Sequence, residues 1–302
     1  MTIVGKRPVI QFDSVIFATD FSPASQNAGL YASAFSRHFV TNLVVAHGFI
    51  LTQAALEVEA GKPRSSQQRV DLNHDLLLTA EALPAGRGTT EFILLEGDPR
   101  KAIPVLAQRR SPALVVMGTH GGGSIDRFVL GSTAEGILRH SSEPALTVGP
   151  NVTILRPGVL QIRRILYATD CSAEAAHAAP VAIALADAFS AGLDVLHVIH
   201  SSEVDHPDQF HMLQQHFYSA VEAIMPHFAE QVCESHTFVS VGQPHTEILK
   251  HIDEREIDLL ILGLRRNAHL GMQNRTSRAF PIIIEAKCPI ITVASGSPFQ
   301  SS

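Results

Sequence analysis

The sequence contains no tryptophan and only three cysteines among its 302 residues. Cys171, Cys233 and Cys288 share no CxxC spacing, which is typical of a reducing compartment and of small buried thiols. An excess of basic residues is also missing, because the formal net charge is −6, and this argues against an electrostatic grip on nucleic acid. No segment is long and apolar enough to span a bilayer, and no signal-length apolar core begins the chain. We therefore expect a cytoplasmic protein that binds neither nucleic acid nor membranes.

The chain carries an internal repeat. Val15–Ser22 (VIFATDFS) returns as Ile165–Ser172 (ILYATDCS), at an offset of 150 residues (170 − 20). Leu114–Gly118 (LVVMG) returns as Leu259–Gly263 (LLILG), at an offset of 145 residues (263 − 118). Further landmarks keep the same order, so the sequence indicates a tandem duplication joined near Asn151–Arg163.

We place the two domains at 1–150 and 151–302, and in each of them apolar strands alternate with helices. In the first domain, Ser22 and Pro23 are typical of a helix start, and another helix is expected to begin at Pro99. The expected strands are Ser14–Ala18, Leu43–Ala46, Glu91–Leu95, Ala113–Met117 and Pro144–Val148. Apolar strands separated by helices predict an α/β fold with a parallel sheet covered on both faces.

A glycine-rich stretch follows the fourth of these strands and precedes a helix. Gly118 and Gly121 let backbone approach a ligand with no Cβ in the way, so a valine there is expected to block phosphates. Gly131 and Ser132 open the helix, where free N–H groups favour an anion. The alternative is a plain turn, with Ser132 and Glu135 forming a capping box. The stretch is not a P-loop, because no Gly-Lys-Ser/Thr follows a strand, and it does not follow the first strand as a Rossmann fingerprint does.

Asp20 follows the first strand and has two possible roles. In an open parallel sheet, ligands bind beyond the carboxyl ends of the strands. If the strands before Asp20 and Gly118 are neighbours, Asp20 lies beside the glycine stretch and can accept a hydrogen bond from an adenine or ribose group. Alternatively, its carboxylate caps the helix that follows.

The sixteen histidines form no catalytic or metal-binding constellation in the sequence. His47 and His197 end strands and are expected to be satisfied structural groups. His120 could contact phosphate but has no evident partner as a base, and Arg127 is either a phosphate contact or a solvated loop residue. Four further histidines have a poor spacing for a metal site and are expected to be solvated: His206, His211, His216 and His227.

These features together resemble the universal stress protein family. The resemblance rests on the strand ending Ala-Thr-Asp-Phe-Ser, the Gly-Asp-Pro turn and the glycine spacing; it covers Val15–Gly149 well and Arg164–Val293 more weakly. It implies two tandem doubly wound domains, each with a five-stranded parallel sheet in the order 3-2-1-4-5. It also implies ATP as ligand, with a divalent metal such as Mg²⁺ in many members, and a role under stress.

The resemblance also implies which residues hold the nucleotide. The base and ribose would be contacted by Ala18, Thr19, Asp20 and Gly48. The ribose and phosphates would be approached by Met117, Gly118, His120 and Gly121. The phosphate tail would be held by Gly131, Ser132 and Thr133. Gly48 replaces the branched apolar residue usual in the family, which weakens adenine packing, and Ala134 replaces a hydroxyl residue of some binders.

The leading interpretation is an ATP-binding regulatory protein of the stress response. A second class is a slow ATPase or phosphotransferase, because the sequence offers a phosphate cradle without a positioned base or a Walker lysine. A third class is an interaction module that no longer uses nucleotide. The sequence assigns no catalytic residue and no metal ligand.

The second copy departs from the glycine signature, so we expect one site per chain, in the first half. Arg266 falls where Gly121 stands (266 − 145), and Thr276 falls where Gly131 stands (276 − 145). A β-branched threonine cannot readily replace Gly131 if that glycine is left-handed, and only Ser277 matches its counterpart. The alternative is a different anion site made by Arg265, Arg266, Arg275 and Arg278.

The resemblance further implies pairing through the last strands. In this chain the two copies would supply both partners, with Ala145–Val148 packed against Ile290–Val293 as an internal pseudo-dimer. Both segments are short apolar edge strands, which need covering. A further homodimer is an open alternative.

Overall fold

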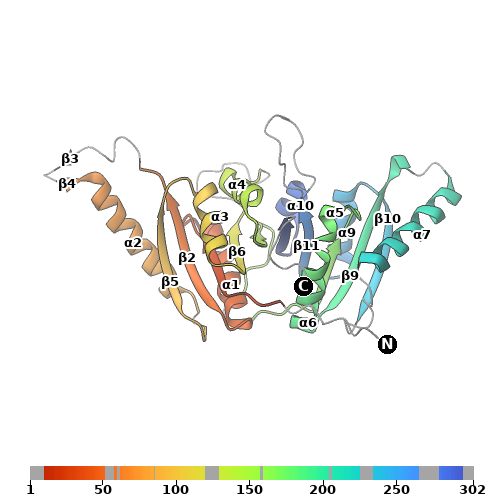
Figure 1. Ribbon diagram of the computed structural model, residues 1–302, viewed down its shortest axis with the longest axis horizontal. Helices are drawn as coiled ribbons and strands as arrows, with labels where there is room; N and C mark the ends of the chain where they lie inside the picture. Colours follow the sequence, from red (N-terminus) through yellow and green to blue (C-terminus); the bar gives the residue numbers. More distant parts are fainter. Residues whose placement is uncertain are drawn as a thin grey trace. The chain divides into compact units, whose positions relative to one another are not determined.

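A computed structural model describes residues 10–51, 58–59, 62–84, 86–119, 129–156, 159–203, 206–224, 234–264 and 279–294. The chain divides into two compact units. The N-terminal unit contains Phe12–Pro150 and Ile154–Leu160, and the C-terminal unit contains Gln161–Ser302, Asn151–Thr153 and Met1–Gln11. Each unit is an α/β structure in which helices flank a sheet of strands (Figure 1). The α/β fold predicted from the sequence is confirmed.

The N-terminal unit has a sheet of five parallel strands, in the order β5-β2-β1-β6-β7. Its elements along the chain are β1 (Ser14–Ala18), α1 (Pro23–His38), β2 (Asn42–Phe49), β3 (Val58–Glu59), β4 (Lys62–Pro63), α2 (Arg64–Ala82), β5 (Thr90–Glu96), α3 (Pro99–Arg109), β6 (Ala113–Gly118), α4 (Ser132–His140) and β7 (Ala145–Val148). The two-residue strands β3 and β4 pair with each other in antiparallel fashion. β1 and β6 are neighbours, as expected, with Ala18 opposite Met117.

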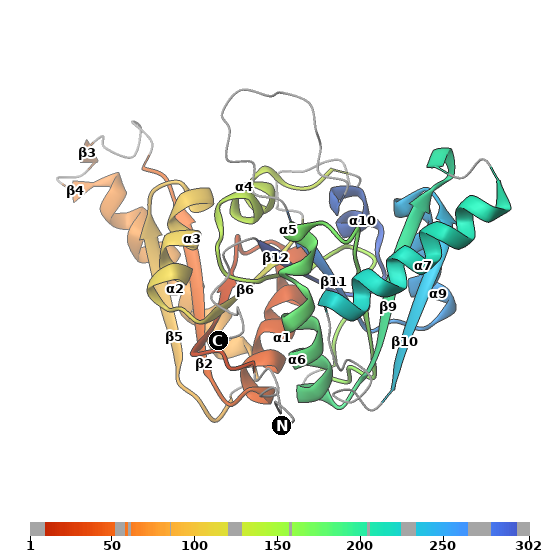
Figure 2. The same cartoon turned by 45° about the vertical axis from the view of Figure 1, so that its right-hand side comes forward.

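The C-terminal unit repeats this arrangement, in the order β10-β9-β8-β11-β12 (Figure 2). Its elements are β8 (Arg164–Ala168), α5 (Ala173–Ala176), α6 (Ala179–Phe189), β9 (Gly192–His200), the 3₁₀ turn Ser201–Glu203, α7 (Pro207–Ile224), β10 (Ser235–Gly242), α9 (Pro244–Glu254), β11 (Leu259–Leu264), α10 (Ala279–Glu285) and β12 (Ile290–Ala294). Within the described ranges, no helix has both the length and the hydropathy needed to cross a membrane.

The helix starts follow from local sequence. Ser22 caps α1, because its side chain accepts a hydrogen bond from Ser25 N. Pro23 occupies the first turn, where a backbone N–H would have no intrahelical acceptor, so proline costs no hydrogen bond there. Asp98 caps α3 in the same way by accepting from Arg100 N, and Pro99 follows it. Both helix starts predicted from the sequence are confirmed.

The start of α4 differs from the expectation. Gly131 is the N-cap and makes no side-chain bond, while Ser132 is already the first helical residue. The predicted capping box of Ser132 and Glu135 is therefore wrong. Gly131 has a φ of −59°, which any residue adopts, so the argument that Thr276 could not take its conformation is wrong as well.

The strand interiors form the core of each unit. In β1 and β6, Val15, Ile16, Val115 and Val116 are completely buried, since helices cover both faces of the sheet. The carboxyl ends of these strands carry the polar residues discussed next.

Candidate functional site

The turn after β1 is held by its own side chains. Thr19 Oγ1 accepts a hydrogen bond from Phe21 N at 3.0 Å. Asp20 Oδ1 accepts from Ser22 N at 3.1 Å and from Ser22 Oγ at 2.6 Å. Phe21 between them has a φ of 63°, in the left-handed region. These bonds hold the turn that connects β1 to α1. They give Asp20 the role at the helix start that the sequence offered as one alternative. The Asp20 side chain remains exposed.

The C-terminal unit repeats this turn. Thr169 Oγ1 accepts from Cys171 N at 3.0 Å, and Asp170 Oδ1 accepts from Ser172 N at 3.0 Å. Cys171 has a φ of 58°. Because the turn recurs where the glycine signature has been lost, the Thr-Asp-x-Ser bonds serve the fold of both units.

His47 and His197 are anchored in the same way. His47 Nδ1 lies 2.8 Å from Thr19 O, and His197 Nδ1 lies 2.9 Å from Thr169 O. A carbonyl only accepts, so each Nδ1 carries a proton and donates it. These bonds agree with the structural role predicted for both histidines. Phe21 lies against the His47 ring, whereas Phe217 of α7 stacks on His197 in the C-terminal unit.

The end of β6 and the start of α4 are tied together. Thr119 N donates to Val148 O at 3.2 Å, and Gly131 N donates to Thr119 O at 2.8 Å. The first turn of α4 is thus fixed beside the carboxyl end of β6. Its first N–H groups lack intrahelical partners, and the N-cap residue, Gly131, has no side chain to cap them. Free N–H groups and the helix dipole favour an anion at this position.

A cavity of about 730 Å³ opens at this edge of the N-terminal sheet. It lies among the ends of β1, β2 and β6 and the first turns of α3 and α4. Nine of the eleven site residues predicted from the sequence line it: Ala18, Thr19, Asp20, Gly48, Met117, Gly118, Gly131, Ser132 and Thr133. His120 and Gly121 lie outside the described residues, as do Arg127 and the arginines proposed for the second copy.

Several lining residues were not predicted from the sequence. They are Ser25, Ala46, Pro99, Ile103, Thr119, Val129, Leu130, Glu135 and Ile137, together with His47, which the sequence assigned to the fold alone. Pro99 belongs to the Gly-Asp-Pro turn that the sequence singled out, and Ile103 follows it by four residues on the same helix face. The spacing of this pair could have indicated that α3 contributes residues to the cavity.

Gly118 lines the cavity, but its missing side chain serves a different purpose from the one expected. A Cβ at Gly118 would lie 3.3 Å from Ala24 O and 3.5 Å from Ser25 Cα, in α1. The glycine therefore lets α1 pack against the end of β6. A valine here would press its Cβ against α1, and the expectation that it blocks phosphates stays a prediction.

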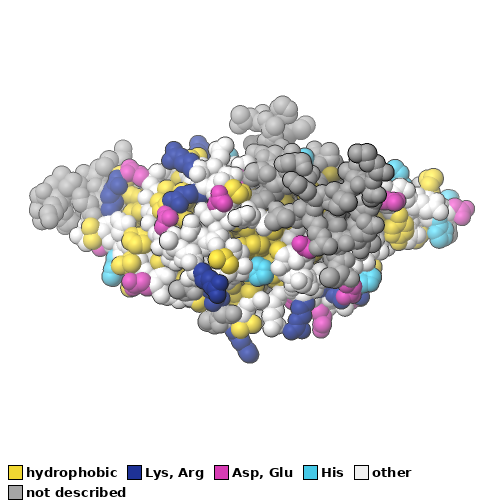
Figure 3. All heavy atoms as spheres, turned by 60° about the horizontal axis from the view of Figure 1, so that its bottom comes forward, with side chains coloured by type: hydrophobic (Ala, Val, Ile, Leu, Met, Phe, Trp, Pro, Cys, Tyr) yellow, Lys and Arg dark blue, Asp and Glu magenta, His cyan; other side chains and the backbone are white. Residues whose placement is uncertain are grey.

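The charged groups of the described lining are carboxylates. Asp20 accepts from Ser22, and Glu135 Oε1 accepts from Arg139 Nε at 2.8 Å and from Arg139 Nη2 at 2.6 Å. On the face drawn in Figure 3, basic and acidic side chains of the described residues are scattered among apolar and uncharged ones. Attraction for an anion in the described lining therefore comes from backbone N–H groups.

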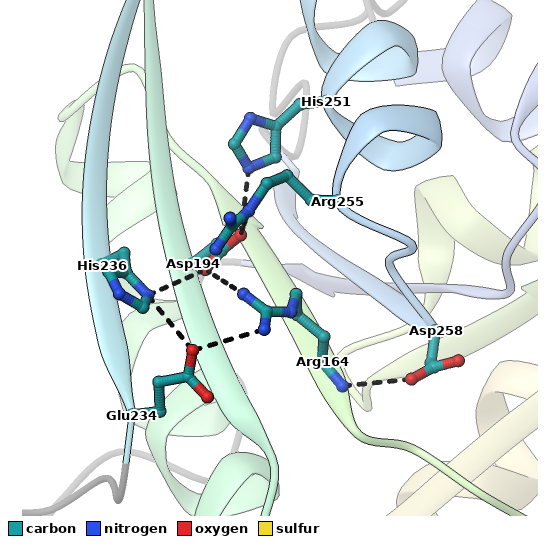
Figure 4. Close-up of polar contacts among 7 residues, drawn as sticks. All are labelled: Arg164, Asp194, Glu234, His236, His251, Arg255 and Asp258. Atoms are coloured by element: carbon teal, nitrogen blue, oxygen red, sulfur yellow. Dashed lines mark hydrogen bonds and ion pairs between the residues drawn. The ribbon is translucent and has the colours of Figure 1, made fainter.

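A second polar cluster lies in the C-terminal unit, near the amino ends of its strands (Figure 4). Asp194 of β9 is fully buried. Its Oδ2 accepts from His251 Nε2 at 3.2 Å and from Arg255 Nε at 3.1 Å. Arg164 Nη1 and His236 Nδ1 lie 3.6 Å from Oδ1. The cluster joins α9 to three strands.

Two more acidic residues complete the cluster. Glu234 accepts from Arg164 Nη2 at 3.3 Å, and Asp258 accepts from the backbone of Arg164 at 3.1 Å. Burial raises the pKa of Asp194, but the hydrogen bonds from His251 and Arg255 outweigh it and hold the pKa below its ordinary value. The N-terminal unit has apolar residues at the matching positions, Val44 (194 − 150) and Leu106 (251 − 145).

The sequence matches the model of the universal stress protein family twice, over residues 11–149 and 161–294. A universal stress protein of Thermus aquaticus is 27% identical over 140 residues, which are 45% of this chain and 98% of that protein. The crystal structure of a universal stress protein from Archaeoglobus fulgidus superposes with a TM-score of 0.70 at 21% identity, covering 95% of this chain and all of that one.

A functionally unknown protein from Pseudomonas aeruginosa superposes with a TM-score of 0.57 at 13% identity, over 95% of this chain and 94% of that one. Structural likeness at such identities concerns the fold, whereas the two family matches together span most of the sequence. The chain belongs to the universal stress protein family, as a tandem member with two domains of that family.

Proposed function

We propose that the protein binds ATP in its N-terminal unit and acts as a regulatory protein of the stress response. The observation that carries the proposal is the cavity at the carboxyl edge of the sheet, with the start of α4, whose N-cap is the glycine Gly131, as one wall. Its volume of about 730 Å³ is within the range of small-molecule sites, roughly 300–1,000 Å³. A phosphate chain fits the first turn of α4, and the base and ribose fit the ends of β1 and β2.

The proposal assigns roles to the chain's own residues. Backbone N–H groups of Ser132 and Thr133 would hold the terminal phosphates. The side chain of Thr19 is buried and accepts from Phe21 N, so Thr19 would shape the ribose end through its backbone. ATP would arrive with Mg²⁺, and Asp20 and Glu135 are the described carboxylates of the lining. The proposal places the protein in the cytoplasm, where ATP is abundant.

Chemistry at this site would be slow hydrolysis at most. The bond from His47 Nδ1 to Thr19 O leaves Nε2 as an acceptor, but His47 lies at the end of β2, where the proposal puts the base and ribose and not the phosphates. Glu135 is paired with Arg139. Within the described lining, the proposal thus leaves no unpaired base beside the phosphates to orient an attacking group. The proposal is therefore binding without efficient turnover.

One nucleotide per chain is part of the proposal. The C-terminal unit keeps the β8 turn and the His197 anchor, but a polar bridge joins the end of β9 to the start of α9. In that bridge His200 Nε2 lies 3.1 Å from Gln243 Oε1. We further propose that the two units form an internal pseudo-dimer through Ala145–Val148 and Ile290–Val293.

The test compares Thr133→Glu with Thr133→Gln in the full chain. Thr133 is exposed at the first turn of α4 and lines the cavity. A glutamate there suits the helix dipole but repels phosphates, so it should lower ATP affinity about tenfold or more without lowering stability. The glutamine variant has a side chain of the same size as glutamate but no charge, so it should bind ATP as the wild type does.

Affinity is measured by equilibrium dialysis with and without Mg²⁺, and nucleotide released from the denatured protein is identified by chromatography. Absence of binding in the wild type, or equal affinity in all three proteins, would contradict the proposal.

A further inference from the structure

The first turn of α3 is seated between two glycines from different elements. A Cβ on Gly48, near the end of β2, would lie 2.7 Å from Pro99 Cβ and 2.8 Å from Pro99 Cα. A Cβ on Gly136, in the second turn of α4, would lie 2.7 Å from Arg100 Cβ and 2.5 Å from Arg100 Cγ. Carbon atoms in contact normally lie about 3.5–4.0 Å apart. Any side chain at Gly48 or Gly136 would therefore displace this turn.

A change of rotamer cannot relieve these contacts. The Cα and Cβ atoms of Pro99 and Arg100 are fixed by the backbone, and the Pro99 ring is rigid. Gly136 also lies inside a helix, where glycine is about 1 kcal/mol less favourable than alanine. The close approach of Arg100 gives a reason for a glycine at this position.

The seated turn is a wall of the candidate site. Gly48 and Pro99 line the cavity, and so do Glu135 and Ile137, which flank Gly136. The turn itself is fixed by the Asp98 cap. Moving this turn as a body would shift Pro99 relative to the lining residues of β2 and α4 and so change the shape of the cavity.

The C-terminal unit has replaced both glycines. Val198 stands at the position of Gly48 (198 − 150), and Pro281 stands at the position of Gly136 (281 − 145). Gly136 is buried under Arg100, whereas Pro281 is exposed. At the position of Gly136 the helix α10 is therefore open to solvent, and the start of α9 instead reaches the end of α10, where His245 Nε2 lies 3.2 Å from Glu285 Oε1.

We propose that Gly48 and Gly136 are spacer positions that seat the first turn of α3, and that this seating sets the affinity of the N-terminal cavity for nucleotide. The inference rests on the proposed function. Val198 and Pro281 deny the same seating to the C-terminal unit and so limit the chain to one nucleotide site. Gly136 would act without touching the ligand, as a positioning residue.

The decisive variants exchange the glycine between the two helices. Gly136→Ala should lower ATP affinity about tenfold or more, because α3 must move away from α4. In Arg100→Gly/Gly136→Ala the residue in α3 has no side chain, so the new Cβ in α4 has room. ATP affinity should therefore return to within about threefold of the wild type. Arg100→Gly alone should bind normally, because its ion pair with Asp98 is exposed and such pairs contribute little.

Gly48 provides an internal contrast. Gly48→Ala should lower affinity as well, but Pro99→Ala should not restore it, because Pro99 Cα would still lie 2.8 Å from the new Cβ. The matched control is Gly29→Ala in α1, whose Cβ would lie 2.8 Å from Phe17 Cε1. This control should lower the thermal midpoint and leave ATP affinity unchanged.

Hydrogen exchange of α3 and α4 in the absence of nucleotide measures how firmly the first turn of α3 is packed, independently of ATP affinity. Exchange should accelerate in Gly136→Ala and recover in the double variant. Unchanged exchange, or unchanged affinity in Gly136→Ala, overturns the inference while the proposed function stands. If the wild type binds no nucleotide, the proposed function fails and the affinity claim fails with it. A double variant that binds no better than Gly136→Ala overturns the spacer role.

Discussion

Replacing the buried Asp194–His251 pair by its apolar counterparts tests what that cluster does for stability. His251→Leu introduces the residue found at Leu106 and removes one hydrogen bond to a charged group, which should lower the free energy of unfolding by about 1.5–3 kcal/mol. Asp194→Val introduces the residue found at Val44 and leaves His251 Nε2 buried without an acceptor, which should cost about 1–3 kcal/mol. Arg255 and Arg164 are 34% and 24% exposed, so they can turn toward water.

The double variant should behave differently from the sum of its parts. Removing both partners leaves no buried polar atom of the pair unsatisfied, and apolar replacement of buried ion pairs is often neutral or stabilising by about 1–4 kcal/mol. Asp194→Val/His251→Leu should thus be at least as stable as either single variant. Urea unfolding followed by circular dichroism measures this, because the chain has no tryptophan to report by fluorescence. Hydrogen exchange assigns the loss to β9 and α9. Additive losses in the double variant would refute the reasoning.

The same cluster predicts a pH dependence with a defined sign. The pKa of Asp194 is lower in the folded state than its ordinary value of 3.8, because His251 and Arg255 hold its charged form. Its contribution to stability is therefore fully present above that ordinary value and is lost as the pH falls through the lowered pKa. The stability difference between the wild type and the Asp194→Val variant should shrink in this acid range, and a difference that grows on acidification would contradict the assignment.

Two further predictions concern buried groups. Burial raises the pKa of Glu143, which accepts a hydrogen bond from Ala113 N at 3.1 Å, so the charged form of Glu143 is disfavoured in the folded state. Glu143→Gln should therefore raise the thermal midpoint at pH 7 and leave it nearly unchanged at pH 4. A lower midpoint at pH 7 would contradict this. Burial raises the pKa of the half-buried Cys171 to about 11 and that of the buried Cys288 to about 12, so both thiols should react slowly with iodoacetamide at pH 8, and Cys288 more slowly than Cys171. Peptide mass spectrometry would show this, and rapid labelling of Cys288 would contradict its burial.

Sequence patterns predicted the elements because the signals for them are local. Ser22-Pro23 and Asp98-Pro99 mark helix starts through hydrogen bonds spanning two or three residues, and the structure contains those bonds. The repeat predicted two copies of one fold, and both units have it. The failures at α4 also have a local cause, since Gly131 takes the capping position with ordinary dihedral angles and leaves Ser132 inside the helix.

The residues that α3 contributes to the cavity were less predictable from the sequence than those at the strand ends. Strand ends such as Ala18 and Met117 follow from strand pairing, whereas Pro99 and Ile103 reach the cavity only because α3 packs closely on β2. That distance depends on Gly48, which the sequence assigned to the ligand alone. The Asp194 cluster was missed because Asp194 stands between Leu193 and Val195 in β9, where a buried carboxylate is not expected. The comparison with Val44 in the other copy was the available signal.

The most direct test of the account is a calorimetric titration of the full chain with ATP in the presence of Mg²⁺. We expect saturation near one nucleotide per chain, with affinity about tenfold or more weaker in Thr133→Glu and unchanged in Thr133→Gln. A stoichiometry near two, or an undiminished binding event in Thr133→Glu, would contradict a single site at the start of α4.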